Sequence, residues 1–114
     1  MTQTNIARNV LDQRLSLWRS VAADAPQPSR GWILAIREAL GMSVTDFARR
    51  LGVSRQRVSQ IEAAEVEGSA TLVTLRRAAE ALGCTLVYAL VPNESLEQIV
   101  RRRARQARYS VGNT

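Results

Sequence analysis

A short polar run, Arg55-Gln56-Arg57 followed by Ser59 and Gln60, holds the side chains best suited to recognition chemistry in this sequence. The guanidinium fork of arginine can donate two hydrogen bonds to guanine, and the glutamine amide pairs similarly with adenine. On a helix, these residues occupy the face left free when Val58 and Ile61 point inward. We predict DNA base contacts for Arg55, Gln56, Arg57, Ser59 and Gln60, with Arg57 able to reach either a base or a phosphate. The plainer interpretation is a solvated polar face.

Residue types that most enzymes use are absent or scarce. There is no histidine, which removes the commonest general base and the commonest metal ligand. Cys84 is the only cysteine, so neither an intrachain disulfide nor a multi-cysteine zinc site can form. The sequence also lacks a glycine-rich phosphate loop and a pair of carboxylates on one helix. We expect no catalytic residue, no metal and no cofactor, and we predict that the protein is not an enzyme.

The composition favours a polyanionic partner. The 114 residues include sixteen arginines, no lysine and ten acidic residues, which gives a net charge of +6. Five of the arginines fall between Arg101 and Arg108, where they either hold phosphates or complement the negative end of a solvated helix. No run of eighteen apolar residues occurs, and the first residues lack the apolar core of a signal peptide. We expect a cytoplasmic protein without membrane contact.

The segment from Val44 to Ala63 has the spacing of a helix-turn-helix. Its apolar positions would join the two helices, a small alanine would sit at the crossing, and a glycine would form the turn. The apolar positions are Phe47, Leu51, Val58 and Ile61, the small residue is Ala48, and the turn glycine is Gly52. Val53 would fill the angle between the helices, and Ser54 would cap the second helix. The second helix, at about residues 54–63, would lie in the major groove.

Phosphate contacts are expected beside this second helix. Ser43 caps the first motif helix, and Thr45 and Arg49 lie on its exposed flank, where contacts with the DNA backbone are common. We predict phosphate contacts for Ser43, Thr45, Arg49 and Ser54. Glu62, Glu65 and Glu67 follow the recognition helix, and we expect one helix-pairing glutamate and two solvated loop acids rather than a metal site.

Further helices are predicted at about residues 5–23, 32–40, 72–82 and 95–109 from the recurrence of apolar residues. The segment Cys84–Val91 is short, rich in β-forming residues and bounded by Gly83 and Pro92, which indicates a strand. The chain is thus expected to comprise residues 1–30 as an N-terminal helix and proline-containing linker, 31–83 as the DNA-binding domain, 84–92 as a dimerisation strand, and 93–114 as a basic C-terminal helix and tail.

A strand without a second strand leaves its backbone groups unpaired. We expect it to pair with the same strand of a second copy, which would make a homodimer with a two-stranded ribbon. The dimerisation contacts would come from Leu86, Val87, Tyr88, Ala89 and Leu90. The alternative is that this segment extends the preceding helix or packs as irregular chain.

The helix-turn-helix pattern resembles the Xre/Cro/phage-repressor family over about residues 32–83. The resemblance implies a mainly α fold with a five-helix core, here with an added N-terminal helix, one C-terminal strand and a basic C-terminal helix. It also implies that Arg37 and Glu62 form a structural ion pair. Val44 departs from the family, since a phosphate-contacting glutamine is common at that position. The implied function is a dimeric transcriptional regulator, most simply a repressor, bound to a near-palindromic operator on double-stranded DNA.

Three stretches, GWILAIREALGMS, LGVSRQRVSQIE and TLRRAAEALGCTLVYALVP, are similar to the family called mobile mystery protein A. That resemblance covers most of residues 10–92. Members tend to be encoded beside a Fic-domain partner, mobile mystery protein B. The resemblance therefore implies an alternative function, an antitoxin-like protein that restrains a Fic-domain partner and binds DNA for autoregulation.

Overall fold

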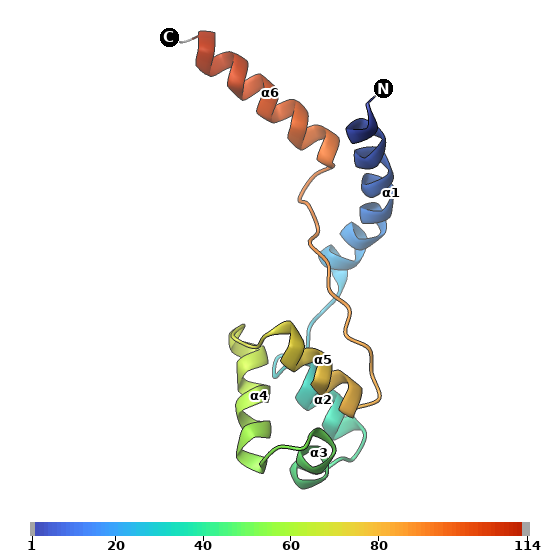
Figure 1. The fold of residues 1–114 in the computed structure, drawn as a ribbon, viewed down its shortest axis with the longest axis vertical. Coiled ribbons are helices and arrows are strands. Elements are labelled where there is room, and N and C mark those ends of the chain that lie inside the picture. Colours follow the sequence, from blue (N-terminus) through green and yellow to red (C-terminus); the bar gives the residue numbers. More distant parts are fainter. Residues whose placement is uncertain (1, 113–114) are drawn as a thin grey trace. The chain divides into compact units, whose positions relative to one another are not determined.

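The computed structural model describes residues 2–112, which contain six helices (Figure 1). The chain divides into two compact units, one from Pro26 to Tyr88 and the other formed by the residues up to Ala25 and those from Ala89 onward. The helices are α1 (Gln3–Asp24), α2 (Trp32–Ala39), α3 (Val44–Leu51), α4 (Arg55–Glu67), α5 (Leu72–Ala81) and α6 (Leu96–Gly112). The mainly α fold class is confirmed, and none of these helices is long and apolar enough to cross a membrane.

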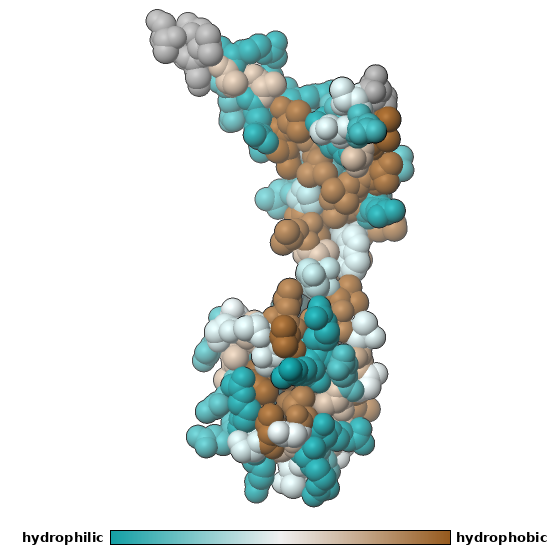
Figure 2. All heavy atoms as spheres, in the orientation of Figure 1, coloured by the Kyte–Doolittle hydropathy of each residue, from teal (hydrophilic) through white to brown (hydrophobic). Residues whose placement is uncertain are grey.

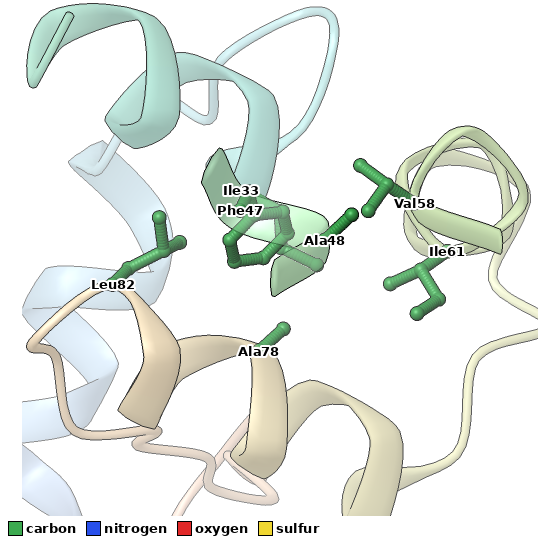
Figure 3. Packing of buried hydrophobic residues seen from close by; sticks show 7 residues of the cluster. All are labelled: Ile33, Phe47, Ala48, Val58, Ile61, Ala78 and Leu82. Atoms are coloured by element: carbon green, nitrogen blue, oxygen red, sulfur yellow. The ribbon is translucent and has the colours of Figure 1, made fainter. Parts of the chain in front are cut away.

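The unit from Pro26 to Tyr88 is built from α2 to α5 around one apolar cluster (Figure 3). Phe47 of α3 and Val58 of α4 lie at its centre with no exposed surface. Burying a side chain of this size contributes about 1.5–3 kcal/mol, so these two residues alone strongly favour the packing of α3 on α4. The other members of the cluster are Ile33, Ala48, Ile61, Ala78 and Leu82.

Side-chain caps define where three of these helices begin. The Ser43 hydroxyl accepts a hydrogen bond from the Asp46 amide at 3.0 Å, and the Ser54 hydroxyl accepts one from the Arg57 amide at 3.0 Å. Thr71 caps α5 in the same way. Each cap satisfies an amide that the first turn of a helix cannot pair, which is worth about 1 kcal/mol. The predicted capping roles of Ser43 and Ser54 are confirmed.

The start of α2 is capped from a distance. Glu65 accepts hydrogen bonds from the Trp32 amide at 2.7 Å and from the Ile33 amide at 3.0 Å. The preceding residue, Gly31, has a φ of 91°, and a Cβ there would lie 2.8 Å from Glu65 Oε1. The prediction that Glu65 is a solvated loop acid is therefore wrong. Helix α4 extends to Glu67, and its last turn supplies the cap of another helix.

The predicted strand is also wrong. Residues 84–91 are irregular chain, and no strand occurs among residues 2–112. Their apolar, β-forming composition is compatible with a strand, but a strand requires a second extended segment to pair with. Residues 85–91 form no backbone–backbone hydrogen bond within the described part of the chain.

The five-helix core implied by the family resemblance is not observed either. The unit from Pro26 to Tyr88 contains four helices, α2 to α5. After α5, the chain passes Gly83 and continues through residues 84–95 without a helix until α6 begins at Leu96. The next helix after α5 thus belongs to the other compact unit, where it contacts α1.

In that unit, polar contacts join α1 to the start of α6. Asp12 caps α6 by accepting hydrogen bonds from the Leu96 amide at 2.7 Å and the Glu97 amide at 3.2 Å. Arg8 pairs with the Glu97 carboxylate at 2.9 Å. Arg19 donates to the carbonyl oxygen of Pro92 at 3.4 Å, just before α6. These contacts fix the first turn of α6 against one face of α1.

Candidate nucleic-acid interface

The turn between α3 and α4 places α4 across α3. Gly52 ends α3 in the left-handed region, with φ 73° and ψ 34°, a conformation that is strained for any residue with a Cβ. The Val53 amide then bonds to the Ala48 carbonyl at 3.0 Å, and Ser54 starts α4. Gly52, Val53 and Ser54 therefore connect α3 directly to α4, in the turn that the sequence predicted for them.

The packing of α4 determines which of its side chains remain free. Ala48 is 4% exposed and allows α4 to approach α3 closely, while Val58 and Ile61 are the two buried residues of α4 (Figure 3). Because successive residues of a helix are about 100° apart, Gln56, Ser59 and Gln60 lie on the side opposite these buried residues. Arg55, Gln56, Arg57, Ser59 and Gln60 are all exposed.

Arg57 differs from the other four predicted base-contacting residues. It lies on the flank of α4, where it lines a small pocket of about 100 Å³ together with Val53 and with Thr74 and Arg77 of α5. Helical spacing also puts it beside Ile61 rather than opposite it. Its position at the edge of the exposed face suits a contact with the DNA backbone as well as with a base.

Of the predicted phosphate-contacting residues, Ser43 and Thr45 lie at the N-terminus of α3, Ser54 caps α4, and Arg49 lies in the last turn of α3. Ser43, Thr45, Arg49 and Ser54 are exposed. The hydroxyls of Ser43 and Ser54 already accept backbone hydrogen bonds, but each keeps its own proton to donate. Arg49 is 3.8 Å from Asp46, and both side chains are largely solvated, so this weak pair leaves the guanidinium available.

The charge of this surface is positive. Residues 43–60 contain four arginines, at positions 49, 50, 55 and 57, and a single acid, Asp46. All four arginines are exposed. Glu62, the next acid along the chain, is neutralised by Arg37. A surface with a local excess of three positive charges attracts the phosphates of nucleic acid before any specific contact forms.

Arg37 of α2 and Glu62 of α4 form a buried ion pair beneath this surface. Arg37 Nε is 2.7 Å from Glu62 Oε1, and the side chains are only 10% and 11% exposed. A second nitrogen of Arg37 donates to the Met42 carbonyl at 3.1 Å, in the turn before α3. One guanidinium therefore connects α2, the start of the helix-turn-helix and α4. This is the position of the structural pair that the family resemblance implied.

A pocket of about 290 Å³ lies elsewhere on the same unit, among α2, α5 and residues 84–87. Most of its lining is apolar, including Trp32, Ile36 and Leu75. Its one carboxylate, Glu65, has both oxygens bonded to the amides of α2. Cys84 is half-buried there, with its Sγ 3.7 Å from the Leu82 carbonyl. None of the residues predicted to contact DNA lines this pocket.

The described residues contain no group of three histidine, cysteine, aspartate or glutamate side chains that could hold a metal ion. A comparison with protein families matches residues 33–88 to a family described as Helix-turn-helix. Comparisons with curated proteins and with solved structures find no match. The matched residues include all of α3, α4 and α5, and the match agrees with the turn geometry at Gly52.

Proposed function

We propose that this protein is a sequence-specific DNA-binding regulator whose helix α4 lies in the major groove. The observation that carries the proposal is the exposed face of α4, where Gln56, Ser59 and Gln60 lie opposite the buried Val58 and Ile61. Side chains with amide, hydroxyl and guanidinium groups match the donor and acceptor pattern of base edges. We assign base contacts to this face, with Arg55 beside it and Arg57 at its edge.

Phosphate contacts would set the orientation of the domain on the duplex. We assign these contacts to the exposed residues Ser43 and Thr45 at the N-terminus of α3, Ser54 at that of α4, and Arg49 in the last turn of α3. Helix N-termini carry partial positive charge and favour a nearby phosphate. Val44, next to Ser43, is half-buried and offers no polar group. Anchoring to the backbone would therefore rest on the serines, on Thr45 and on the guanidinium of Arg49.

We further propose that the regulator acts as a dimer, most simply as a repressor. Two copies of α4 related by a two-fold axis would read a near-palindromic operator with half-sites about 34 Å apart. The exposed side chains of Val87, Tyr88, Ala89 and Leu90, together with the half-buried Leu86, would supply contacts between the copies. Leu90 is 90% exposed, and burial in a dimer would remove this apolar surface from water.

Selection of bound sequences from a pool of random duplexes tests this function. We expect enrichment of a near-palindrome by the full chain, and a relaxed or changed preference for the Gln56→Ala variant. Arg30→Ala is a suitable control, because it changes an exposed arginine that precedes α2 and lies outside α3 and α4. Enrichment of no sequence, with binding that only weakens as salt rises, would contradict sequence-specific recognition.

A second candidate is an antitoxin-like protein that binds and restrains a partner, in line with the resemblance to mobile mystery protein A. The observation that favours it is the separate unit formed by α1 and α6, which is distinct from the DNA-binding unit and free for another role. In this case the partner would be a Fic-domain protein, and DNA binding would serve autoregulation. Co-purification with the product of the adjacent gene tests this candidate, and the absence of a stable complex would contradict it.

A further inference from the structure

Within the described part of the chain, the unit formed by α1 and α6 has no apolar core of its own. None of the residues of α1 is buried, and no residue from Ala89 to Arg108 is buried either. Polar contacts of Arg8, Asp12 and Glu97 join the two helices, and the apolar residues Leu15, Leu96 and Ile99 are only half-buried. A pair of helices that buries so little surface cannot offset the entropy lost on ordering it. This unit therefore needs a further surface to pack against.

The half-buried positions of α1 identify the face that contacts the start of α6. They are Arg8, Asp12, Leu15 and Arg19, which are spaced four, three and four residues apart and so share one side of the helix. Three of the four are charged. The side of α1 that an amphipathic helix would normally bury is in this case its polar side.

The opposite side of α1 is apolar and exposed. Each residue of a helix advances by about 100° around its axis. On this basis an arc of about 60°, opposite the polar contact face, contains Ile6, Val10, Leu17 and Val21. Their exposed fractions are 49%, 46%, 75% and 52%. Figure 2 shows hydrophobic residues, in brown, gathered on the surface of this unit. We call these four residues the α1 stripe.

The spacing of the α1 stripe is symmetric about its own midpoint. Ile6 and Val21 are equally far from the bond between Gln13 and Arg14, and so are Val10 and Leu17. This spacing suits an antiparallel pair of identical helices related by a two-fold axis, because each apolar residue then faces another apolar residue at the symmetric position. Ile6 would face Val21 of the partner subunit, and Val10 would face Leu17 of the partner subunit.

The charges of the stripe also fit a second copy of this chain. None of its four residues is charged, and the polar residues at its centre are Gln13 and Arg14. Gln13 and Arg14 lie about 50° to either side of the stripe, so in the antiparallel pair each would lie beside the same residue of the partner subunit, at the edge of the seam.

We propose that α1 is a dimerisation helix, which pairs in antiparallel orientation with α1 of a second copy through the α1 stripe. This interface adds a surface to the dimer proposed above, and it does not depend on which bases α4 contacts. It also gives a role to the N-terminal helix, which the helix-turn-helix match over residues 33–88 does not include.

Analytical ultracentrifugation of the full chain over nanomolar to micromolar concentrations tests the proposal. We expect a dimer whose dissociation constant rises at least about 100-fold in Val10→Glu, because a buried unpaired carboxylate is costly. Leu11→Glu is the matched control, since Leu11 is 45% exposed but lies off the stripe, and it should dimerise like the wild type.

A charge-pair variant tests the antiparallel register. In the double variant Val10→Glu/Leu17→Arg, opposite charges face each other across an antiparallel pair, so dimerisation should recover at least tenfold over Val10→Glu. In a parallel pair, like charges would meet and no recovery would occur. Recovery also shows that the single variant had not simply failed to fold.

Three results would overturn the proposal: a monomeric wild-type chain, a Val10→Glu variant that dimerises normally, or a double variant without recovery. Loss of the dimer in Leu90→Ser but not in Val10→Glu would assign the interface to residues 86–90 instead. The base preference for a single half-site can be measured with a variant that does not dimerise. Failure of this interface and failure of DNA recognition are therefore distinguishable.

Discussion

Removal of Arg37 should destabilise the helix-turn-helix unit far more than removal of a surface arginine. Arg37 Nε lies 2.7 Å from Glu62 Oε1, and both side chains are about nine-tenths buried. Arg37→Met keeps an apolar stem of similar length but leaves the Glu62 carboxylate without its cation and the Met42 carbonyl without its donor. Breaking a buried pair from one side costs about 3–5 kcal/mol. Because a domain of this size is stable by about 5–15 kcal/mol, the variant should be marginal.

The double variant Arg37→Met/Glu62→Leu distinguishes the contribution of the ion pair to stability from the cost of burying one unpaired charge. Replacing both partners with apolar side chains should restore most of the loss, to within about 1–2 kcal/mol of the wild type, since no buried charge remains. Arg49→Met is the comparison at the surface, where the pair with Asp46 is 3.8 Å long and largely solvated. It should cost less than about 1 kcal/mol.

Urea unfolding followed by tryptophan fluorescence measures these differences. Trp32 belongs to the helix-turn-helix unit and Trp18 to the other unit, so the series is best made in a Trp18→Phe background. The free energies then report the unit that contains Arg37. A loss below about 1 kcal/mol in Arg37→Met would refute the reasoning, because the pair would then behave as a solvated one.

Three further changes test other contacts. Gly31→Ala should lower the melting temperature more than Gly68→Ala, since both glycines have positive φ but only the first would bring a Cβ against Glu65; equal losses would contradict this. Glu65→Gln should lower the free energy of unfolding in urea by about 1–3 kcal/mol, because the NH2 group of glutamine cannot accept a hydrogen bond and one of the two backbone N–H groups of α2 loses its partner. An unchanged stability would exclude the cap. The hydrogen bond from Arg8 lowers the pKa of Glu97, so its contribution to stability is present above pH about 4.5 and is lost as the pH falls through the lowered value. Thermal unfolding of Glu97→Gln should therefore depend less on pH in the acidic range than that of the wild type, and identical pH profiles would count against the pair.

Much of the helix-turn-helix unit was predictable because local chemistry determines it. Ser43 and Ser54 cap their helices, Gly52 takes the left-handed conformation, and Phe47 and Val58 are fully buried, as the sequence pattern indicated. Each of these features depends on residues a few positions apart. The exposed face of α4 follows from the same periodicity, because the burial of Val58 leaves its other sides free.

Features that depend on distant contacts were not predictable in this way. The role of Glu65 depends on the backbone amides of Trp32 and Ile33, which lie far earlier in the chain. Only the packing of α4 against α2 brings the carboxylate to these amides. The strand prediction at residues 84–91 failed because β-forming composition cannot supply a pairing partner. Sequence periodicity found α1, but not that its contact with α6 uses its charged side, including Arg8 and Asp12.

The most direct test of DNA reading by α4 is the ratio of dissociation constants for a selected duplex and for duplexes with single base changes. These ratios should be measured at two salt concentrations for the wild type, Arg55→Ala, Gln56→Ala and the control Arg30→Ala. We expect each α4 variant to lose discrimination at one base position by about 1–3 kcal/mol, or roughly 5- to 150-fold, while the control keeps it. Unchanged ratios in both α4 variants, with only a uniform loss of affinity, would contradict the assignment of α4 as the recognition helix.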